Sequence, residues 1–145
     1  MDKRRAKESF EVALRTSEPA FETFFLSRLL GLDFAYAEDS CTISFEVFDF
    51  MFNPQGSLHG GLIATVMDIS MGHLIKRRFG PGVTLEMKVQ YLKPVLTGVA
   101  SAAARFLNAG TSTHFMRSDF HDADATLCAF ATATWKTASF HVVQA

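Results

Sequence analysis

The sequence has few cysteines and almost no net charge, and each absence excludes a class of protein. Two cysteines in 145 residues, Cys41 and Cys128, cannot form the disulfide framework of a small secreted domain. We therefore expect both to be buried, reduced thiols in a cytoplasmic protein. A formal net charge of −1 gives the chain no general attraction for nucleic acid or for an anionic membrane, so neither is expected as a partner.

Long apolar runs are also absent. The N-terminal segment 1–9 is dominated by charged residues and predicts no signal peptide. The most apolar stretch, residues 62–75, is interrupted by Asp68 and His73, so no segment is expected to span a membrane. The chain has no linker or internal repeat, and its length predicts one domain with a hydrophobic core.

Metal-binding patterns are missing as well. Metal sites gather histidine with cysteine or carboxylate ligands at characteristic spacings. Four histidines show no such spacing: His73, His114, His121 and His141. We therefore expect no metal ion.

The sequence does contain one apolar helix that carries a carboxylate. A turn with Gly56 leads into Gly60 and Gly61, and the following residues 62–75 are apolar on every face of a predicted helix. Such a helix is normally buried in the middle of a domain, where an unpaired charge is costly. Asp68 lies within it, so we expect burial to raise the pKa of its carboxyl, and we interpret Asp68 as a functional residue.

Helices are predicted before this segment and strands around it. An amphipathic pattern predicts a helix over residues 3–14, and Ser17 with Pro19 predicts the start of a second one, which Gly31 ends. Alternation of apolar and polar residues predicts strands near 41–47, 83–91, 99–107, 113–121 and 126–135. One antiparallel sheet curled around a single central helix satisfies this order, with the last four strands as a meander.

Phenylalanine is unusually frequent, with fifteen residues beside one tryptophan and two tyrosines. The excess suits a flat or acyl ligand, but a core packed with phenylalanine is the simpler interpretation. Phe21, Phe24, Phe25 and Leu29 repeat at helical spacing, so we expect them to anchor the second N-terminal helix on the body of the domain.

The segment around the glycine pair resembles the hotdog-fold acyl-CoA thioesterases, in particular the phenylacetate-type branch of the 4-hydroxybenzoyl-CoA thioesterase superfamily. Residues 81–94 look like the strand that follows in that family. The other matching positions are Asn53, Gly56, His59, Gly60, Gly61 and Asp68. The resemblance implies an α+β hotdog fold, in which one curved antiparallel sheet wraps around a long central helix. Residues 1–145 would form a single domain, with residues 1–31 as an N-terminal helical segment packed on it.

The spacing of His59 and Asp68 predicts more than one chain per site. They are nine residues apart, which is half a turn out of phase on one helix and a rise of roughly 13 Å. A site that uses both the glycine turn and Asp68 therefore needs a second copy of the helix, antiparallel to the first. The resemblance implies the same, because hotdog proteins form homodimers edge to edge, with two equivalent active sites between the central helices. We expect a homodimer, or a homotetramer if two dimers pair through the outer faces of their sheets.

Thioester hydrolysis needs a nucleophile at the carbonyl carbon and a donor for the oxygen that becomes negative. The N–H of Gly60 stands at the positive end of the helix, and no side chain blocks the approach to it. Asp68 of the other chain would act as a general base on water, or as a direct nucleophile through an anhydride. Asn53 can hold the carbonyl or the water. By resemblance, Thr84 takes the place of a hydroxyl residue that positions the water.

His59 has two interpretations. Its ring could be a catalytic base, or it could brace the glycine turn and bond a neighbouring carbonyl, and we favour the brace. The basic residues 76–78 complement the helix dipole first. Together with Lys93 and Arg105, they are second-choice contacts for the CoA phosphates.

Three functions are compatible with the sequence. The first is an acyl-CoA thioesterase with an aryl-acetyl or medium-chain acyl substrate, which requires no cofactor because CoA is part of the substrate. The second is a hotdog protein that binds acyl-CoA without cleaving it. The third is a hotdog hydratase or dehydratase, which would pair a histidine with a carboxylate. The combination of Asn53, Gly60 and Asp68 favours the thioesterase.

Overall fold

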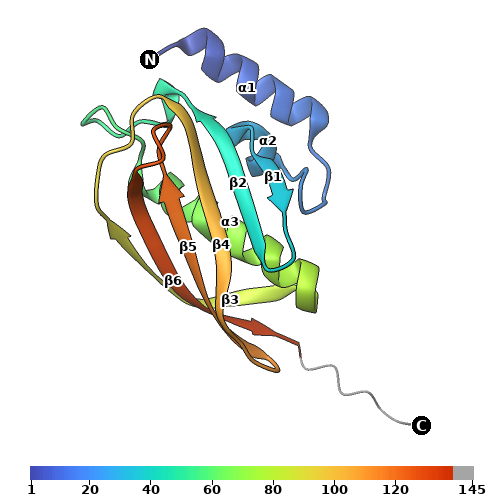
Figure 1. Cartoon of the computed structure of the whole chain (residues 1–145). Helices are drawn as coiled ribbons and strands as arrows, with labels where there is room; N and C mark the ends of the chain where they lie inside the picture. Colours follow the sequence, from blue (N-terminus) through green and yellow to red (C-terminus); the bar gives the residue numbers. More distant parts are fainter. Residues whose placement is uncertain (139–145) are drawn as a thin grey trace.

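Six antiparallel strands form one sheet that curls around helix α3 (Gly60–Phe79), as Figure 1 shows. The computed structural model describes residues 1–138, so His141 lies outside the described residues. The strands are β1 (Asp33–Tyr36), β2 (Ser40–Val47), β3 (Gly82–Tyr91), β4 (Gly98–Ala109), β5 (Thr113–His121) and β6 (Leu127–Thr137). The predicted α+β hotdog architecture is confirmed.

The sheet order is β1-β2-β4-β5-β6-β3, so the predicted four-strand meander is wrong for β3. Strand β3 pairs with β6 and forms one edge of the sheet, whereas β4, β5 and β6 are consecutive neighbours. The connection from β3 to β4 passes the N-terminal end of α3, where the N–H of Leu58 donates to the C=O of buried Val95 (2.8 Å). Alternation within a strand predicts the strand but not its neighbour, because the neighbour depends on where the connection runs.

A β-bulge interrupts the alternation of β3. Thr84 and Glu86 pair with consecutive residues of β6, which leaves Leu85 without a partner there. An extra residue of this kind changes the face on which the following side chains lie. Thr84 therefore lies on the inner face of the sheet together with Met87, and both are partly buried. The expectation of a strictly regular strand was wrong, and the bulge is the feature that lets Thr84 face α3.

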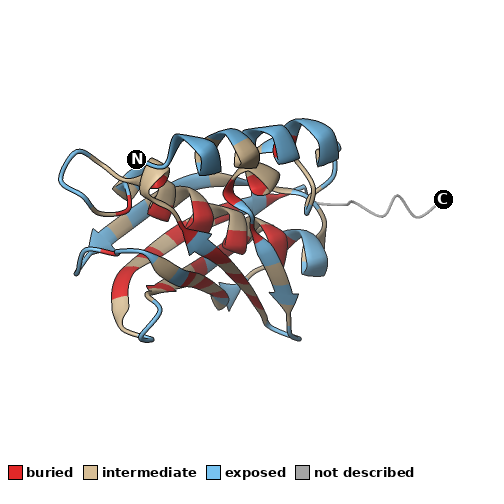
Figure 2. Ribbon diagram, turned by 90° about the horizontal axis from the view of Figure 1, so that it is seen from above, coloured by how far each residue is buried: buried red, intermediate tan, exposed pale blue. Residues whose placement is uncertain are grey.

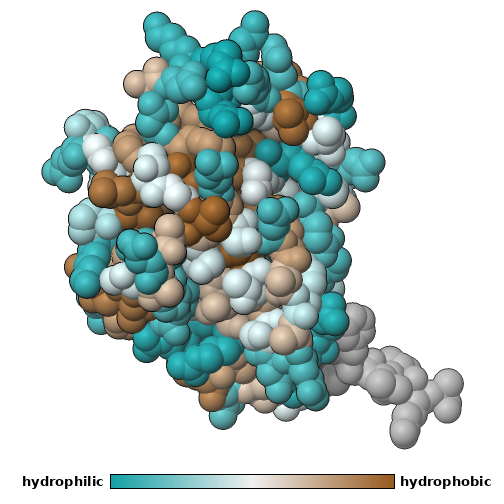
Figure 3. Space-filling view, turned by 45° about the horizontal axis from the view of Figure 1, so that its top comes forward, coloured by the Kyte–Doolittle hydropathy of each residue, from teal (hydrophilic) through white to brown (hydrophobic). Residues whose placement is uncertain are grey.

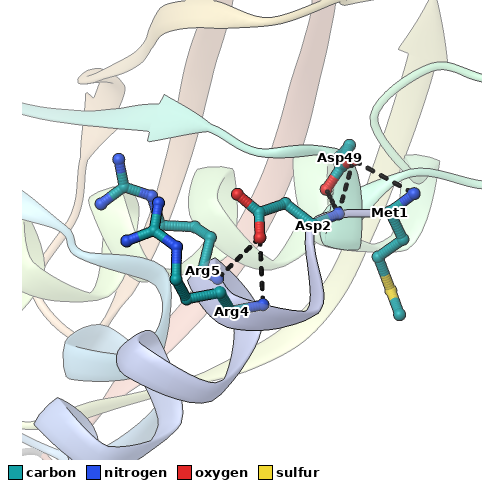
Figure 4. A network of polar contacts seen from close by, with 5 residues as sticks. All are labelled: Met1, Asp2, Arg4, Arg5 and Asp49. Atoms are coloured by element: carbon teal, nitrogen blue, oxygen red, sulfur yellow. Dashed lines mark hydrogen bonds and ion pairs between the residues drawn. The ribbon is translucent and has the colours of Figure 1, made fainter.

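Helix α1 (Lys3–Thr16) is fastened to the domain at its first turn. The Asp2 carboxylate accepts hydrogen bonds from two backbone N–H groups of that turn (3.0 and 3.1 Å). The N–H of Asp2 donates to the carboxylate of Asp49 in the short 3-10 helix η1 (Asp49–Met51), as Figure 4 shows. The outer surface of the helix is mostly hydrophilic (Figure 3), although Phe10, Val12 and Leu14 are also exposed.

The second N-terminal helix, α2 (Phe25–Leu30), is shorter than predicted. Gly31 ends it in a left-handed conformation (φ 64°), as expected, but residues 17–24 form turns instead of helix. The N–H of Glu18 donates to the C=O of Thr23 (2.9 Å), which folds this segment back on itself before α2 begins. Residues 17–24 are called the connector below.

The core lies between α3 and the sheet (Figure 2). The buried residues of α3 are Ile63, Val66, Met67, Ser70, Met71, His73, Leu74 and Ile75. The expectation that α3 is buried all round was wrong for one face, because Leu62, Thr65, Asp68 and Ile69 are only partly buried. Within a single chain, α3 thus keeps an open face that carries the carboxylate.

Two further expectations concern the cysteines and membrane segments. Cys41 and Cys128 are both buried and form no disulfide, as predicted. Among the helices of residues 1–138, none combines the length and the apolar character that a membrane crossing requires.

Candidate active site

Helix α3 begins with one backbone N–H that has no hydrogen-bond acceptor within residues 1–138. The C=O of His59 accepts from the N–H groups of Leu62 (2.9 Å) and Ile63 (3.2 Å). The N–H of Gly61 donates to the Nδ1 atom of His59 (2.9 Å). The N–H of Gly60 is left over at the positive end of the helix. The geometry thus leaves at Gly60 the free donor that an oxyanion needs, and its catalytic role stays a prediction.

His59 occupies the capping position of α3. Its Nδ1 atom accepts a hydrogen bond from the N–H of Gly61, so this nitrogen is already occupied by the turn. The side chain is otherwise exposed. The ring thus contacts the turn through the N–H of Gly61 and not through the neighbouring carbonyl that was expected.

Tyr91 contacts the same turn, and the sequence did not reveal it. The Tyr91 hydroxyl donates to the C=O of Gly60 (2.8 Å). A β-carbon on Gly60 would lie 3.2 Å from the Cε1 atom of the tyrosine ring, so the missing side chain is what admits Tyr91. The two residues are 31 positions apart, and the alternation of β3 indicates only that Tyr91 ends a strand.

A cavity of about 310 Å³ lies beside the glycine turn, and its lining includes Asn53, Gly60 and Tyr91. The Asn53 side chain holds its own turn, because Oδ1 accepts from the N–H of Gln55 (2.9 Å) and Nδ2 donates to Oγ of Ser57 (3.2 Å). An amide nitrogen has two N–H donors, so one remains for a carbonyl or a water in the cavity. The predicted role of Asn53 is compatible with this geometry.

Asp68, on the open face of α3, contacts Thr84 of strand β3. The Thr84 hydroxyl donates to Oδ1 of Asp68 (2.7 Å). Burial raises the pKa of the Asp68 carboxyl above its ordinary value of 3.8, and the hydrogen bond from Thr84 opposes part of that rise. A carboxylate with a raised pKa is a better proton acceptor than an exposed one, which suits a general base.

Asp68 belongs to a second cavity, of about 380 Å³. Its walls come from the connector, α3, β3 and β6, and they include Phe21, Phe24, His73 and Trp135. Gly60 is not among these residues, and Asp68 is not among those that line the cavity beside Gly60. The axial rise between the two positions on α3 is roughly 12 Å. One chain alone therefore does not bring the carboxylate and the free N–H to a common substrate atom.

The basic residues at the end of α3 make contacts of their own. Lys76 and Arg77 lie over aromatic rings, and Arg78 pairs with Asp39. Lys93 instead lines the cavity beside Gly60. Among the second-choice contacts for CoA phosphates, Lys93 is therefore better placed than residues 76–78.

Comparison with known families decides between the functions that this geometry allows. Residues 55–129, just over half of the chain, match the sequence model of the Thioesterase superfamily. The chain belongs to this family. It is a thioester hydrolase, and the matched region contains Gly60, Asp68 and Thr84.

Relatives of this thioesterase agree with the assignment. The medium/long-chain acyl-CoA thioesterase YigI of Salmonella typhimurium is 27% identical to it over 128 residues, which cover 75% of this chain and 83% of YigI. The Escherichia coli PaaI protein, from the phenylacetic acid degradation operon, has a TM-score of 0.78 at 17% identity and covers 90% of this chain and 96% of its own. A thioesterase of Haemophilus influenzae has a TM-score of 0.72 at 22% identity, and the match covers 80% of this chain and 84% of that thioesterase. The two structures share the fold of this chain.

Proposed function

We propose that this thioesterase hydrolyses an acyl-CoA thioester to the free acid and CoA at a site shared by two copies of the chain. Asp68 of one copy acts as the general base or nucleophile, and the Gly60 N–H of the other copy polarises the carbonyl. The observation that carries this proposal is the Asp68–Thr84 hydrogen bond at the wall of a cavity, in a chain of the thioesterase superfamily. The likeness to YigI, a medium/long-chain acyl-CoA thioesterase, supports CoA as the leaving group and a medium-chain acyl group. An aryl-acetyl group is the alternative that the resemblance in sequence implies.

Two routes use the same residues. In the general-base route, Asp68 takes a proton from water while the water oxygen attacks the carbonyl carbon, and the Gly60 N–H stabilises the oxygen that becomes negative. The carbon–sulfur bond then breaks, and the sulfur of CoA leaves with the proton that Asp68 holds. In the nucleophilic route, Asp68 displaces CoA to form an anhydride, which water hydrolyses. Neither route requires a metal ion or a cofactor beyond the CoA of the substrate.

Two features of the single chain support the second copy. The open face of α3 carries apolar side chains, such as Leu62, that a partner helix would cover. Strand β3 is an edge strand with Val83 and Leu85 exposed at 61% and 58%, and long apolar edges of this kind are normally covered. Pairing of two β3 edges would place the α3 helices side by side, with Gly60 of one chain near Asp68 of the other.

A pair of dimers is a natural extension of this arrangement. Val99 and Phe115 lie on the outer face of the sheet and are exposed at 58% and 48%. Burial of exposed aromatic and aliphatic side chains is favourable, so this face could join two dimers into a tetramer.

The hydratase or dehydratase alternative has less support. It requires a histidine paired with a carboxylate at the site, and the Nδ1 atom of His59 already accepts from Gly61. His73 lines the Asp68 cavity, but its Nδ1 atom lies 2.8 Å from the hydroxyl of Tyr36. Burial also lowers the pKa of His73, which disfavours its action as an acid.

The pH dependence of hydrolysis should report on Asp68. The reaction needs the ionised carboxylate, so kcat/KM is expected to fall as the pH drops through the raised pKa of Asp68. Thr84→Val removes the hydrogen bond that favours the ionised form, so the acid limb of the profile should move to higher pH. The control is Thr134→Val on β6, which removes a hydroxyl that does not contact Asp68. An acid limb that stays in place in Thr84→Val would contradict the role of Asp68.

Release of the CoA thiol from a panel of acyl-CoA thioesters tests the proposed function. We expect turnover of at least one aryl-acetyl-CoA or medium-chain acyl-CoA. Calorimetry on the same panel separates binding from hydrolysis. Binding of acyl-CoA without thiol release would contradict the proposal and support the non-catalytic alternative.

A further inference from the structure

The connector between α1 and α2 forms part of the wall of the Asp68 cavity. Phe21 and Phe24 line this cavity together with Asp68, although the spacing of these phenylalanines predicts only packing. With Ile69 and Trp135, they make the largely apolar walls of an open cavity that contains one carboxylate. An apolar cavity that begins at the catalytic carboxylate is suited to the acyl part of a thioester rather than to the charged CoA part.

The position of Phe21 along α3 indicates which end of the cavity it closes. Its ring packs edge-on against His73, with 5.3 Å between ring centroids, and the Lys76 ammonium nitrogen lies 4.2 Å from the centre of the Phe21 ring. His73 and Lys76 are five and eight residues after Asp68, which is a rise of roughly 8 to 12 Å along the helix. Phe21 therefore lies one to two helical turns away from Asp68 along α3.

The connector is held in this position by hydrogen bonds on two sides. The buried hydroxyl of Ser27 contacts the C=O groups of Glu22 (2.8 Å) and Phe24 (2.9 Å). The Glu22 carboxylate accepts from the Tyr36 hydroxyl of β1 (2.8 Å). These contacts hold the backbone directly after Phe21, and the hydrogen bond from the N–H of Glu18 to the C=O of Thr23 spans Phe21. The wall is therefore present before substrate binds.

We propose that Phe21 is a specificity-determining residue that closes the far end of the acyl pocket and sets the longest acyl chain that is hydrolysed efficiently. This inference rests on the proposed function of Asp68. The cavity volume of about 380 Å³ corresponds to on the order of ten methylene groups, if each takes about the volume of a water molecule, ~30 Å³. The expected substrate class is therefore a medium-length or aryl acyl group.

Two opposite substitutions at Phe21 test the proposal. Phe21→Ala enlarges the pocket and should move the chain-length optimum to longer acyl groups, whereas Phe21→Trp should move it to shorter ones. One methylene in an apolar pocket changes kcat/KM by about tenfold or more. For acyl groups just longer than the wild-type limit, kcat/KM should therefore rise about tenfold in Phe21→Ala, when it is divided by kcat/KM for the acyl group that the wild type prefers. The measurement is kcat/KM over a series of saturated acyl-CoA thioesters.

A neighbouring phenylalanine provides the control. Phe25 packs on Phe10 with 5.7 Å between ring centroids and does not line the cavity, so Phe25→Ala should keep the wild-type chain-length profile. Phe24→Ala is a second variant of the wall, for use if Phe21→Ala fails to fold by circular dichroism. Folded wall variants that hydrolyse acyl-CoA with an unchanged profile would overturn the inference and leave the proposed function intact. Absence of hydrolysis by the wild type would overturn both.

Discussion

Replacement of Asp68 by asparagine is expected to reduce turnover by about two to four orders of magnitude, the scale of losing a general base or nucleophile. The amide cannot take a proton from water and cannot attack a carbonyl carbon. The side chain keeps its size, and the Thr84 hydroxyl can still donate to its oxygen, so the fold should be unchanged. Steady-state kinetics on the best acyl-CoA substrate measures the effect.

A control and a second readout separate chemistry from folding. Asp124→Asn makes the same change in an exposed turn and should leave turnover unaltered. Burial raises the pKa of Asp68 in the folded state, so its ionised form costs stability above that pKa, and the cost disappears as the pH falls through it. Asp68→Asn should therefore unfold at a higher temperature than the wild type at neutral pH, and the gain should shrink in acid. Near-wild-type turnover in this variant would contradict the role of Asp68 as general base or nucleophile.

Replacement of Gly60 by valine is expected to cost about 3 kcal/mol in transition-state stabilisation, the typical effect of losing one oxyanion donor. A side chain at this position crowds the free N–H, which must lie about 3 Å from the developing oxyanion. It also meets the Tyr91 ring, since a β-carbon would lie 3.2 Å from it. Gly60→Ala carries the smaller side chain and should lose less activity, and thermal unfolding of both variants checks that the turn survives.

The effect of His59→Ala distinguishes the oxyanion role from a histidine mechanism. His59 caps α3 through Gly61, so its loss should weaken the helix start, at a cost of about 1 kcal/mol, and reduce turnover less than Gly60→Val does. If His59→Ala proved as severe as Asp68→Asn while Gly60→Val stayed active, the histidine would be the catalytic group. The hydratase alternative would then be preferred.

Local features of this thioesterase could be predicted from its sequence because they depend on neighbouring residues. The glycine turn, the start of α3 at Gly60 and the raised pKa of Asp68 all follow from the segment that contains them. The need for a second chain follows from helix geometry alone, and it stays a prediction. The strands after Pro94 were also predicted correctly, since each carries its own alternation.

Features that depend on distant contacts could not be predicted in the same way. The pairing of β3 with β6 is set by the connection that passes the start of α3. The bulge at Leu85 breaks an alternation that is regular in the sequence, so only the family resemblance placed Thr84 near Asp68, and its catalytic role stays a prediction. Phe21 has helical spacing to its neighbours, yet it lies in a connector that folds back onto the Asp68 cavity.

The central claim is that each active site combines Asp68 of one chain with Gly60 of another, and subunit complementation tests it most directly. Asp68→Asn chains and Gly60→Val chains, each strongly impaired alone, are unfolded together in equal amounts and refolded as a mixture. Random pairing makes half of the dimers mixed, and one of the two sites in each mixed dimer is intact, so about one quarter of the wild-type activity should return. Activity that stays at the level of the two separate variants, although mass spectrometry detects mixed dimers, would contradict the shared site.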